Sequence, residues 1–271
     1  MKPTYQKTHI QKLLNTITWN DKRFHADYSL DPYKNCELGC LYCDSSYDNT
    51  IHIKTNAAEL LNKELTENKP GRILIGTVHD PYQPAENTYH LTRKILQTLT
   101  KHPKYSIHLL TKTTTLLNDL DIITQLNDPQ ITISLTTTDQ NISNYFEPHV
   151  PSPKKRLQTI KILREKGITA GLSLMPIIPG ITDQNLQKTI QDIQTVQPSY
   201  LLHKHLELKG DQQTHFKTLI DTKYPHLKAL YQDLYNQSYQ PPQHYIDELN
   251  QQINTLCKTY NLKTQVPKTT H

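Results

Sequence analysis

Three cysteines near the start of this 271-residue chain are the residues whose spacing points most directly to chemistry. Cys36, Cys40 and Cys43 form a CxxxCxxC pattern, and the chain has only one further cysteine, Cys257. Three thiolates in one loop can bind three irons of a [4Fe–4S] cluster, because soft sulfur ligands suit iron–sulfur sites. The fourth iron then has no protein thiolate, and an open coordination position is typical of a catalytic metal site. The spacing therefore predicts chemistry at a metal cluster.

A zinc site is the alternative interpretation of the same cysteines, with Asp44, His25 or His52 as the fourth ligand. Structural zinc normally takes four protein ligands, usually from paired CxxC-type units, and this sequence has no second pair. The second hypothesis is therefore a non-catalytic nucleic-acid-binding protein that is stabilised by zinc or by an iron–sulfur cluster. Metal analysis separates it from the first.

Length and composition describe a polar chain that is long enough for one barrel or two small domains. Hydrophobic residues make up 35% of it, and the mean hydropathy is −0.67. No apolar run approaches the roughly 18 residues of a membrane span, and residues 1–7 contain no apolar signal segment. Clustered cysteines are not typical of a disulfide framework, so we expect a cytoplasmic protein with no membrane partner.

The net charge of +5 and the 14 histidines are compatible with a polyanionic partner such as nucleic acid. The basic residues are scattered, however, and the densest group is the triplet Lys154-Lys155-Arg156. A triplet of this kind is common at a solvated helix start. Charge alone therefore permits nucleic-acid binding without requiring it.

The elements that must position the cysteines alternate between short β-branched strands and helical patterns. Strands are expected just before Cys36 and at residues 73–75, 107–110, 131–135, 170–175 and 200–206; helices are expected at 86–99, 116–126, 153–166 and 186–193. The helix at 153–166 is the best marked, because Ser152 can cap it and Gly167 can end it. Six β/α units in series predict an α/β fold with a parallel sheet and outer helices, either open or rolled into a partial barrel.

The alternation stops near residue 211, and residues 211–260 have helical patterns with breaks at Pro225 and at 241–242. We therefore expect an N-terminal segment at residues 1–27, a core at 28–210 and a helical C-terminal extension at 211–271 that packs on the core. Cys257 falls in the extension and is expected to be buried and inert.

Several motifs follow one another in a fixed order along residues 30–180. They are LDPY at 30–33 with CELGCLYC at 36–43, GTVHDPYQPAE at 76–86, LTK at 110–112, SLTT at 134–137, EP at 147–148 with KRL at 155–157, and PIIPG at 176–180. Together they resemble the radical S-adenosylmethionine (SAM) superfamily, in the DNA-repair-photolyase-like branch related to spore photoproduct lyase. The resemblance spans roughly residues 28–206 and implies a partial (β/α)6 TIM-like barrel with a helical C-terminal extension.

The resemblance implies an enzyme in which a [4Fe–4S] cluster cleaves SAM reductively to a 5′-deoxyadenosyl radical, which takes hydrogen from a substrate. A nucleic-acid lesion is the first candidate substrate, and a protein or small metabolite is a weaker one. The expected partners are SAM and an electron donor such as flavodoxin or ferredoxin, and the chain is expected to be a monomer. Spore photoproduct lyase uses a cysteine as hydrogen donor after its second barrel strand, but residues 77–86 here contain none. Catalytic residues beyond the cluster are therefore not assigned.

Three residues are candidates for the SAM carboxylate. Lys112 and Ser134 lie at or near the carboxyl ends of predicted strands, where barrel enzymes build their sites. The resemblance assigns both to the carboxylate, which a cation and a hydroxyl suit. Arg156, in the first turn of its helix, is the third candidate.

The remaining SAM contacts follow from the resemblance alone. Tyr42 occupies the position of an adenine contact, and residues 176–180 are expected beside the adenine. Gly76 and Asp80 occupy the region where many relatives hold the amino group with a Gly-Gly-Glu motif, which this chain lacks. Asp80, Gln83 and Glu86 share one predicted loop and are expected to form a binding loop.

Overall fold

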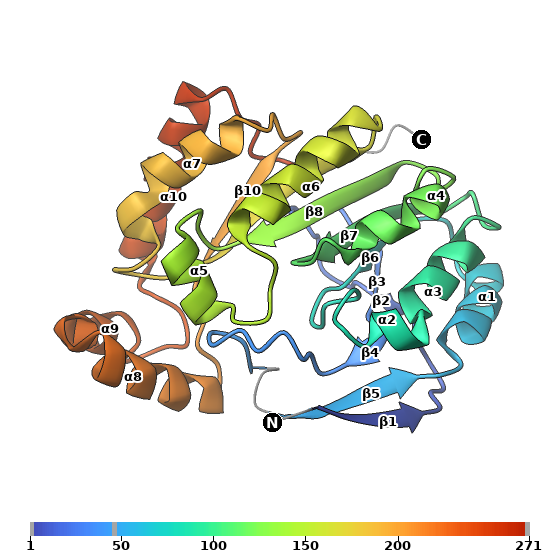
Figure 1. Cartoon of the computed structure of the whole chain (residues 1–271), viewed down its shortest axis with the longest axis horizontal. Coiled ribbons are helices and arrows are strands. Elements are labelled where there is room, and N and C mark those ends of the chain that lie inside the picture. The colour runs from blue at the N-terminus through green and yellow to red at the C-terminus, as the bar shows by residue number, and fades with distance from the viewer. Residues whose placement is uncertain (1–2, 45–47, 269–271) are drawn as a thin grey trace.

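The computed structural model describes residues 3–44 and 48–268, and its centre is a sheet of seven strands in the order β10-β9-β8-β7-β6-β3-β2 (Figure 1). Six of these strands are parallel neighbours in chain order: β3 (Tyr28–Leu30), β6 (Arg72–Ile75), β7 (Ser106–Thr111), β8 (Pro129–Leu135), β9 (Thr169–Ile177) and β10 (Leu201–His205). The short strand β2 (Asn15–Thr16) pairs antiparallel with β3. In the part of the chain that the structure describes, β10 and β2 end the sheet, so the predicted partial barrel is confirmed as an open one.

The first barrel strand is not the one expected just before Cys36. That segment is β4 (Tyr33–Lys34), which pairs antiparallel with β5 (Thr50–Lys54) in a separate sheet of the order β1-β5-β4, where β1 is Thr4–Thr8. The barrel strand β3 lies a few residues earlier. Residues 31–32 separate the two, and the proline at 32 cannot donate to a strand ladder. Such short strands give no periodicity that could tell them apart.

Helices cover the outer face of the parallel strands. Figure 1 shows α6, α4, α3 and α1 following one another along this face. The elements are α1 (Ala57–Glu67), α2 (Glu86–Tyr89), α3 (Leu91–Leu99), η2 (Thr115–Asp119), α4 (Leu120–Ile123), α5 (Gln140–Phe146), α6 (Pro153–Glu165), η3 (Asp183–Asn185) and α7 (Leu186–Gln194). Ser152 caps α6 as predicted, by accepting a hydrogen bond from the Lys155 amide. The helix expected at 86–99 breaks at His90, whose φ is +51°, and the one at 116–126 is mostly a 3₁₀ turn with a short α4.

The two faces of the sheet differ in chemistry because side chains alternate along a strand. On β7 and β8, Leu109 and Ile133 point outward into the main core with the apolar stripes of α3, α6 and α7. Apart from Leu110, the alternate residues on the same strands are polar, and His108 and Thr132 hydrogen-bond to each other inside the barrel. Ser134 continues this inner row to the carboxyl end of β8. Polar side chains of the inner face therefore extend to the carboxyl ends of the strands.

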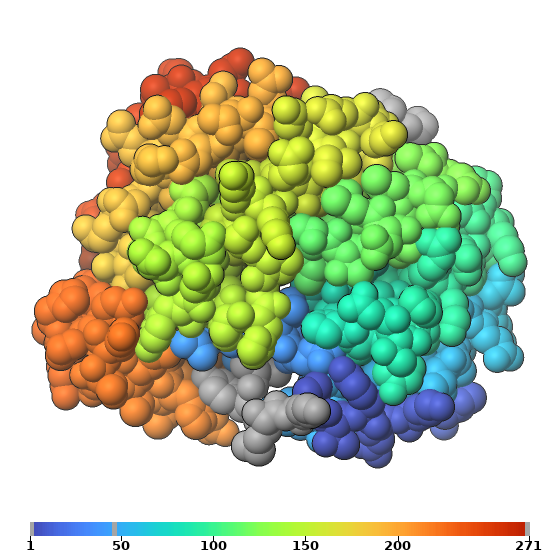
Figure 2. Space-filling model, in the orientation of Figure 1, coloured from blue at the N-terminus to red at the C-terminus, as the bar shows by residue number. Residues whose placement is uncertain are grey.

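The C-terminal helices are α8 (Asp211–Lys223), η4 (Pro225–Leu227), α9 (Lys228–Leu234) and α10 (Gln243–Thr259), with the predicted breaks at 225 and 241–242. Helix α10 packs Leu249, Ile253 and Cys257 into the main core beside α7 and β10. Helices α8 and α9 form the orange lobe of Figure 2, beside α5, and contribute Phe216 to a second apolar cluster that includes Tyr42 of the cysteine loop. Across the described ranges, no helix combines the length and apolar character that a bilayer span requires.

Candidate cluster and SAM site

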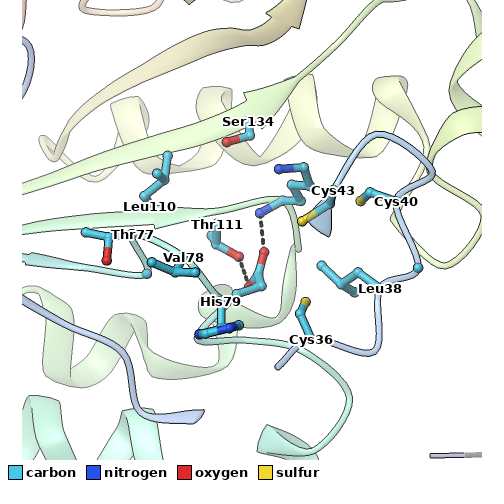
Figure 3. A pocket seen from close by; sticks show the side chains of 14 residues that line it. Cys36, Leu38, Cys40, Cys43, Thr77, Val78, His79, Leu110, Thr111 and Ser134 are labelled. Atoms are coloured by element: carbon cyan, nitrogen blue, oxygen red, sulfur yellow. Dashed lines mark hydrogen bonds between the residues drawn. The ribbon is translucent and has the colours of Figure 1, made fainter. Parts of the chain in front are cut away.

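The three cysteines lie around one pocket at the carboxyl ends of β6, β7 and β8 (Figure 3). The pocket, part of which is open to solvent, contains about 520 Å³ of empty space. Its lining comprises Cys36, Leu38, Gly39, Cys40, Cys43, residues 76–80, residues 110–112 and Ser134. The sequence prediction that the cysteine loop, Lys112 and Ser134 share one site is therefore consistent with the geometry. Gly76 and Asp80 line the same pocket, whereas Tyr42 and Arg156 do not.

The first half of the cysteine loop is held by a buried glutamine. The side-chain amide of Gln83 donates to the Asn35 carbonyl at 3.0 Å, and its oxygen accepts from the Glu37 amide at 3.0 Å. Gly39 then turns the loop with a φ of +65°, a left-handed conformation that glycine adopts without strain. Gln83 is completely buried and lines neither pocket, so its position does not fit the expected binding loop, and its side chain instead holds the cysteine loop.

The second half of the loop is tied to α5 and α8. The Leu41 amide donates to the Phe146 carbonyl at 2.9 Å, and the Tyr42 hydroxyl donates to Glu147 Oε1 at 2.5 Å. The side-chain amide of Gln212, in the first turn of α8, donates to the Tyr42 carbonyl. The C-terminal extension therefore contacts the cluster loop directly.

Asp80 joins the ends of β6 and β7. Its carboxylate accepts hydrogen bonds from Thr111 Oγ1 at 2.6 Å, from the Lys112 amide at 2.7 Å and from the Tyr82 amide at 2.9 Å. Burial raises the pKa of Asp80, while these donors favour the ionised form. Glu86, the third residue of the expected binding loop, instead accepts from the Tyr33 hydroxyl and from amides at the start of α3. Glu86 therefore connects β4 to the start of α3 and has a structural role.

Lys112 places a cation in the pocket. Among the described residues its amine forms no ion pair, and it lies 5.9 Å from the centre of the Tyr42 ring. Burial lowers its pKa, but the nearby Cys40, Glu147 and Asp80 outweigh burial, so the pKa is raised and the amine stays protonated. A protonated amine with no carboxylate partner is suited to a carboxylate that enters the pocket.

Ser134 and Arg156 meet at the end of β8, but only Ser134 faces the pocket. The Ser134 hydroxyl accepts from Ser173 Oγ at 3.2 Å, and its backbone carbonyl accepts from Arg156 Nη1 at 2.9 Å. The Arg156 guanidinium is fully buried and pairs with Glu147 at 2.6 Å. The expected direct contact between Arg156 and the SAM carboxylate does not fit this position, because its charge is already used by Glu147.

A second pocket, with about 890 Å³ of empty space, adjoins the first and shares Cys43, Thr77 and Val78 with it. Tyr42 lies in its wall, together with the apolar side chains of Met175, Pro176 and Leu206. Its rim carries Asp44, next to the last cysteine, and the charged residues Lys204, Glu207 and Lys209, which follow or end β10. Lys204, Glu207 and Lys209 were not predicted from the sequence, although residues at the end of a parallel strand are candidates for a site.

Three histidines near the carboxyl ends of the strands have different surroundings. His79 lines the first pocket and His205 the second, whereas His203 pairs with Asn250 of α10. Burial lowers the pKa of all three, so they are neutral at pH 7. Of the three, His203 lines neither pocket and has a purely structural setting.

The donor set fits a multinuclear cluster better than a single zinc ion. No three His, Cys, Asp or Glu side chains in residues 3–44 and 48–268 converge on a point that one metal ion could occupy. His25 and His52 lie outside both pockets, and His52 is within 3.3 Å of Thr8 Oγ1. Burial raises the pKa of Cys36 to about 12, so the thiolate form needs a bound metal. Three thiols spaced around a cavity suit one iron each.

Comparisons with known proteins give the family. The sequence profile of the radical SAM superfamily matches residues 30–193, more than half of the chain. An uncharacterized protein of Methanocaldococcus jannaschii is 28% identical over 244 residues, which cover 86% of this chain and 87% of that protein. An uncharacterized protein of Mycobacterium tuberculosis (strain ATCC 25618 / H37Rv) is 26% identical over 279 residues, covering 96% and 82%.

The fold is also that of a solved enzyme. A spore photoproduct lyase variant with bound SAM and dinucleoside spore photoproduct superimposes with a TM-score of 0.69 at 15% identity, covering 90% of this chain and 77% of that one. At this identity the likeness concerns the fold alone. The non-catalytic hypothesis is set aside by the family profile rather than by this likeness. The chain belongs to the radical SAM superfamily and is an enzyme whose cofactors are a [4Fe–4S] cluster and SAM.

Proposed function

We propose that this enzyme takes a hydrogen atom from a nucleic-acid lesion. The observation that carries the proposal is the second pocket, which adjoins the cysteine-lined pocket and places two lysines beside an apolar wall. When bound, the cluster and SAM supply reductive cleavage of SAM to a 5′-deoxyadenosyl radical that abstracts hydrogen. The protein's own part is to hold both cofactors, to orient the substrate and to exclude water.

Cofactor binding is assigned to the first pocket. Cys36, Cys40 and Cys43 hold three irons, and the Lys112 amine with the Ser134 hydroxyl holds the SAM carboxylate. Support comes from the two adjacent strand ends that carry these groups and from the unpaired charge of Lys112 among the described residues. A carboxylate between a cation and a hydroxyl gains charge-assisted hydrogen bonds.

The other SAM contacts are assigned to the borders of this pocket. Gly76 and Asp80 also line it, and a carboxylate and close backbone approach suit a ligand amino group. Tyr42 and Pro176 face the second pocket, where an aromatic ring and an apolar ring suit the adenine. The adenosyl group would then point from the first pocket into the second.

The rim of the second pocket supports an anionic substrate. Lys204 and Lys209 both pair with Glu207, at 2.6 and 3.0 Å, and Asp44 adds a second carboxylate to the same lining. Arg23 adds a further charge within electrostatic range of Glu207. The ammonium groups of Lys204 and Lys209 suit phosphate groups, while Met175 and Pro176 offer an apolar wall to a base.

Partners follow from the same chemistry. The cluster needs a low-potential electron donor, for which we propose flavodoxin or ferredoxin. Three clustered cysteines suit a reducing compartment, so we place the enzyme in the cytoplasm, acting as a monomer.

The test uses cluster-loaded protein with oligonucleotides that carry deuterated lesions. The proposal expects deuterium in the released 5′-deoxyadenosine with a damaged strand and none with an undamaged one. Lys204→Ala and Lys209→Ala should weaken binding and lower the slope of log K against log salt by about one each. Lys188→Ala is the matched control, because Lys188 forms a comparable ion pair on an exposed helix face. Salt-independent binding, or equal behaviour of all three variants, would favour a protein or small metabolite as substrate.

A further inference from the structure

A buried carboxylate, Glu147, that lines neither of the two pockets connects the cysteine loop to the proposed SAM anchors. We propose that Glu147 is a positioning residue that sets the distance between Tyr42 and the end of β8, and thereby the affinity for SAM. The inference rests on the proposed roles of Lys112 and Ser134.

Glu147 lies at the end of α5 and is held as an anion by its surroundings. Its side chain and that of Arg156 are both fully buried and lie 2.6 Å apart. Burial alone would raise the pKa of Glu147, but Arg156 and Lys112 lower it below its usual value. A buried charge is retained only when it is paired and hydrogen-bonded, and both conditions hold here.

On one side, Glu147 holds the cysteine loop. Its Oε1 accepts from the Tyr42 hydroxyl at 2.5 Å, between the second and third cysteines of the motif. The adjacent carbonyl of Phe146 accepts from the Leu41 amide. A charge-assisted hydrogen bond to a tyrosine fixes the ring more firmly than packing does.

On the other side, Glu147 acts through Arg156. The same guanidinium that binds Glu147 donates from Nη1 to the carbonyl of Ser134 at 2.9 Å. The Lys112 amine lies over the Tyr42 ring at 5.9 Å. The chain Tyr42–Glu147–Arg156–Ser134 therefore links both anchors of the proposed carboxylate site to the cluster loop, and a change at Glu147 moves both.

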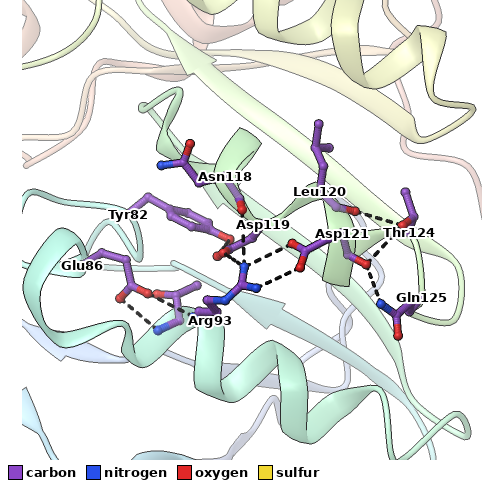
Figure 4. Close-up of polar contacts among 10 residues, drawn as sticks. Tyr82, Glu86, Arg93, Asn118, Asp119, Leu120, Asp121, Thr124 and Gln125 are labelled. Carbon is purple, nitrogen blue, oxygen red and sulfur yellow. Dashed lines mark hydrogen bonds and ion pairs between the residues drawn. The ribbon is translucent and has the colours of Figure 1, made fainter.

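A second triad in the same protein separates positioning from plain stabilisation (Figure 4). Asp119 accepts from the Tyr82 hydroxyl at 2.9 Å and pairs with Arg93 at 2.6 Å. Asp119 is buried, as Glu147 is, but neither it nor its two partners lines either of the two pockets. It is the matched control, because neutralising it disturbs the same kind of network, whose side-chain hydrogen bonds and ion pair reach neither Lys112 nor Ser134.

The experiment compares Glu147→Gln, Tyr42→Phe and Asp119→Asn in cluster-loaded protein, by iron content, thermal midpoint and SAM dissociation constant from calorimetry. Glu147→Gln should keep about four irons and bind SAM on the order of tenfold more weakly. Tyr42→Phe should weaken SAM binding in the same direction by less, and the double variant should be less than additive because both act through one hydrogen bond. Asp119→Asn should lower the thermal midpoint and leave SAM affinity unchanged.

Wild-type SAM affinity in an iron-loaded Glu147→Gln protein would overturn the inference. Equal losses of affinity in Glu147→Gln and Asp119→Asn would do the same, because general destabilisation would then explain both. If Glu147→Gln does not fold, Tyr42→Phe provides the test, because it leaves the ion pair between Glu147 and Arg156 intact. An unchanged SAM affinity in Tyr42→Phe would then refute the positioning role of Glu147. Failure of the proposed function is a different result, namely wild-type protein that releases no 5′-deoxyadenosine.

Discussion

Replacing Gly76 by alanine tests how tightly the ends of β6 and β7 meet at the pocket. Gly76 has a φ of +89°, and a Cβ there would lie 2.3 Å from the Leu110 carbonyl oxygen and 2.6 Å from Pro81 Cδ. Both neighbours are backbone or ring atoms that cannot rotate away. The left-handed conformation costs an L-residue about 1–2 kcal/mol, and overpacking costs about 1–3 kcal/mol more. We therefore expect Gly76→Ala to destabilise the fold by about 2–5 kcal/mol.

Gly167→Ala is the matched control for that prediction. Gly167 has a similar φ of +76°, but nothing lies within 4 Å of its would-be Cβ. Only the conformational cost applies, so about 1–2 kcal/mol is expected. Urea unfolding of both variants against wild type measures the difference, and SAM titration shows whether the strand ends move. If Gly76→Ala costs no more than Gly167→Ala, and SAM affinity is unchanged, the close approach described here is refuted.

Three further predictions concern single residues. Lys112→Met should weaken SAM binding by about 10- to 150-fold, because a hydrogen bond to a charged group is worth roughly 1.5–3 kcal/mol; calorimetry measures this, and wild-type affinity would remove Lys112 from the site. His108 is buried and neutral, and burial lowers its pKa to about 3. Its folded-state pKa lies below the unfolded value of about 6.5, so stability is lost as pH falls from about 6.5 toward 3. Urea unfolding should lose about 1 kcal/mol between pH 7 and 5.5 that His108→Gln does not lose, and equal slopes would contradict this. Cys257 is buried on α10, so Cys257→Ala should retain the iron content of wild type while Cys40→Ala loses it; iron loss in both would place Cys257 at the cluster.

The local signals in the sequence were strong enough to predict most strands of the parallel sheet. The strands at β6 to β10 and helix α6 follow from β-branched runs, a capping serine and a terminating glycine. Lys112 and Ser134 could be placed together because the carboxyl ends of neighbouring parallel strands meet at one edge. The position of the first barrel strand could not be predicted, since β3 and β4 are both short and only their pairing partners distinguish them.

The hydrogen-bond and ion-pair partners of buried polar side chains could not be predicted from the sequence, for a different reason. The motif places Arg156 near the site, but nothing local shows that Glu147 neutralises it completely inside the protein. Gln83 lies in a polar loop, yet its side-chain amide hydrogen-bonds to the cysteine loop, 46 residues or more away in sequence. Such choices depend on tertiary burial, which decides whether a charge is free for a ligand or already paired.

The most direct measurement is the release of 5′-deoxyadenosine by anaerobically reconstituted protein given SAM and reductant. A radical SAM enzyme with this three-cysteine loop should hold about four irons per chain and form 5′-deoxyadenosine only when reductant and SAM are both present. Cys40→Ala, which removes one proposed iron ligand, should form none. Protein that carries an intact cluster and forms no 5′-deoxyadenosine, or colourless protein that holds one zinc per chain, would contradict the assignment.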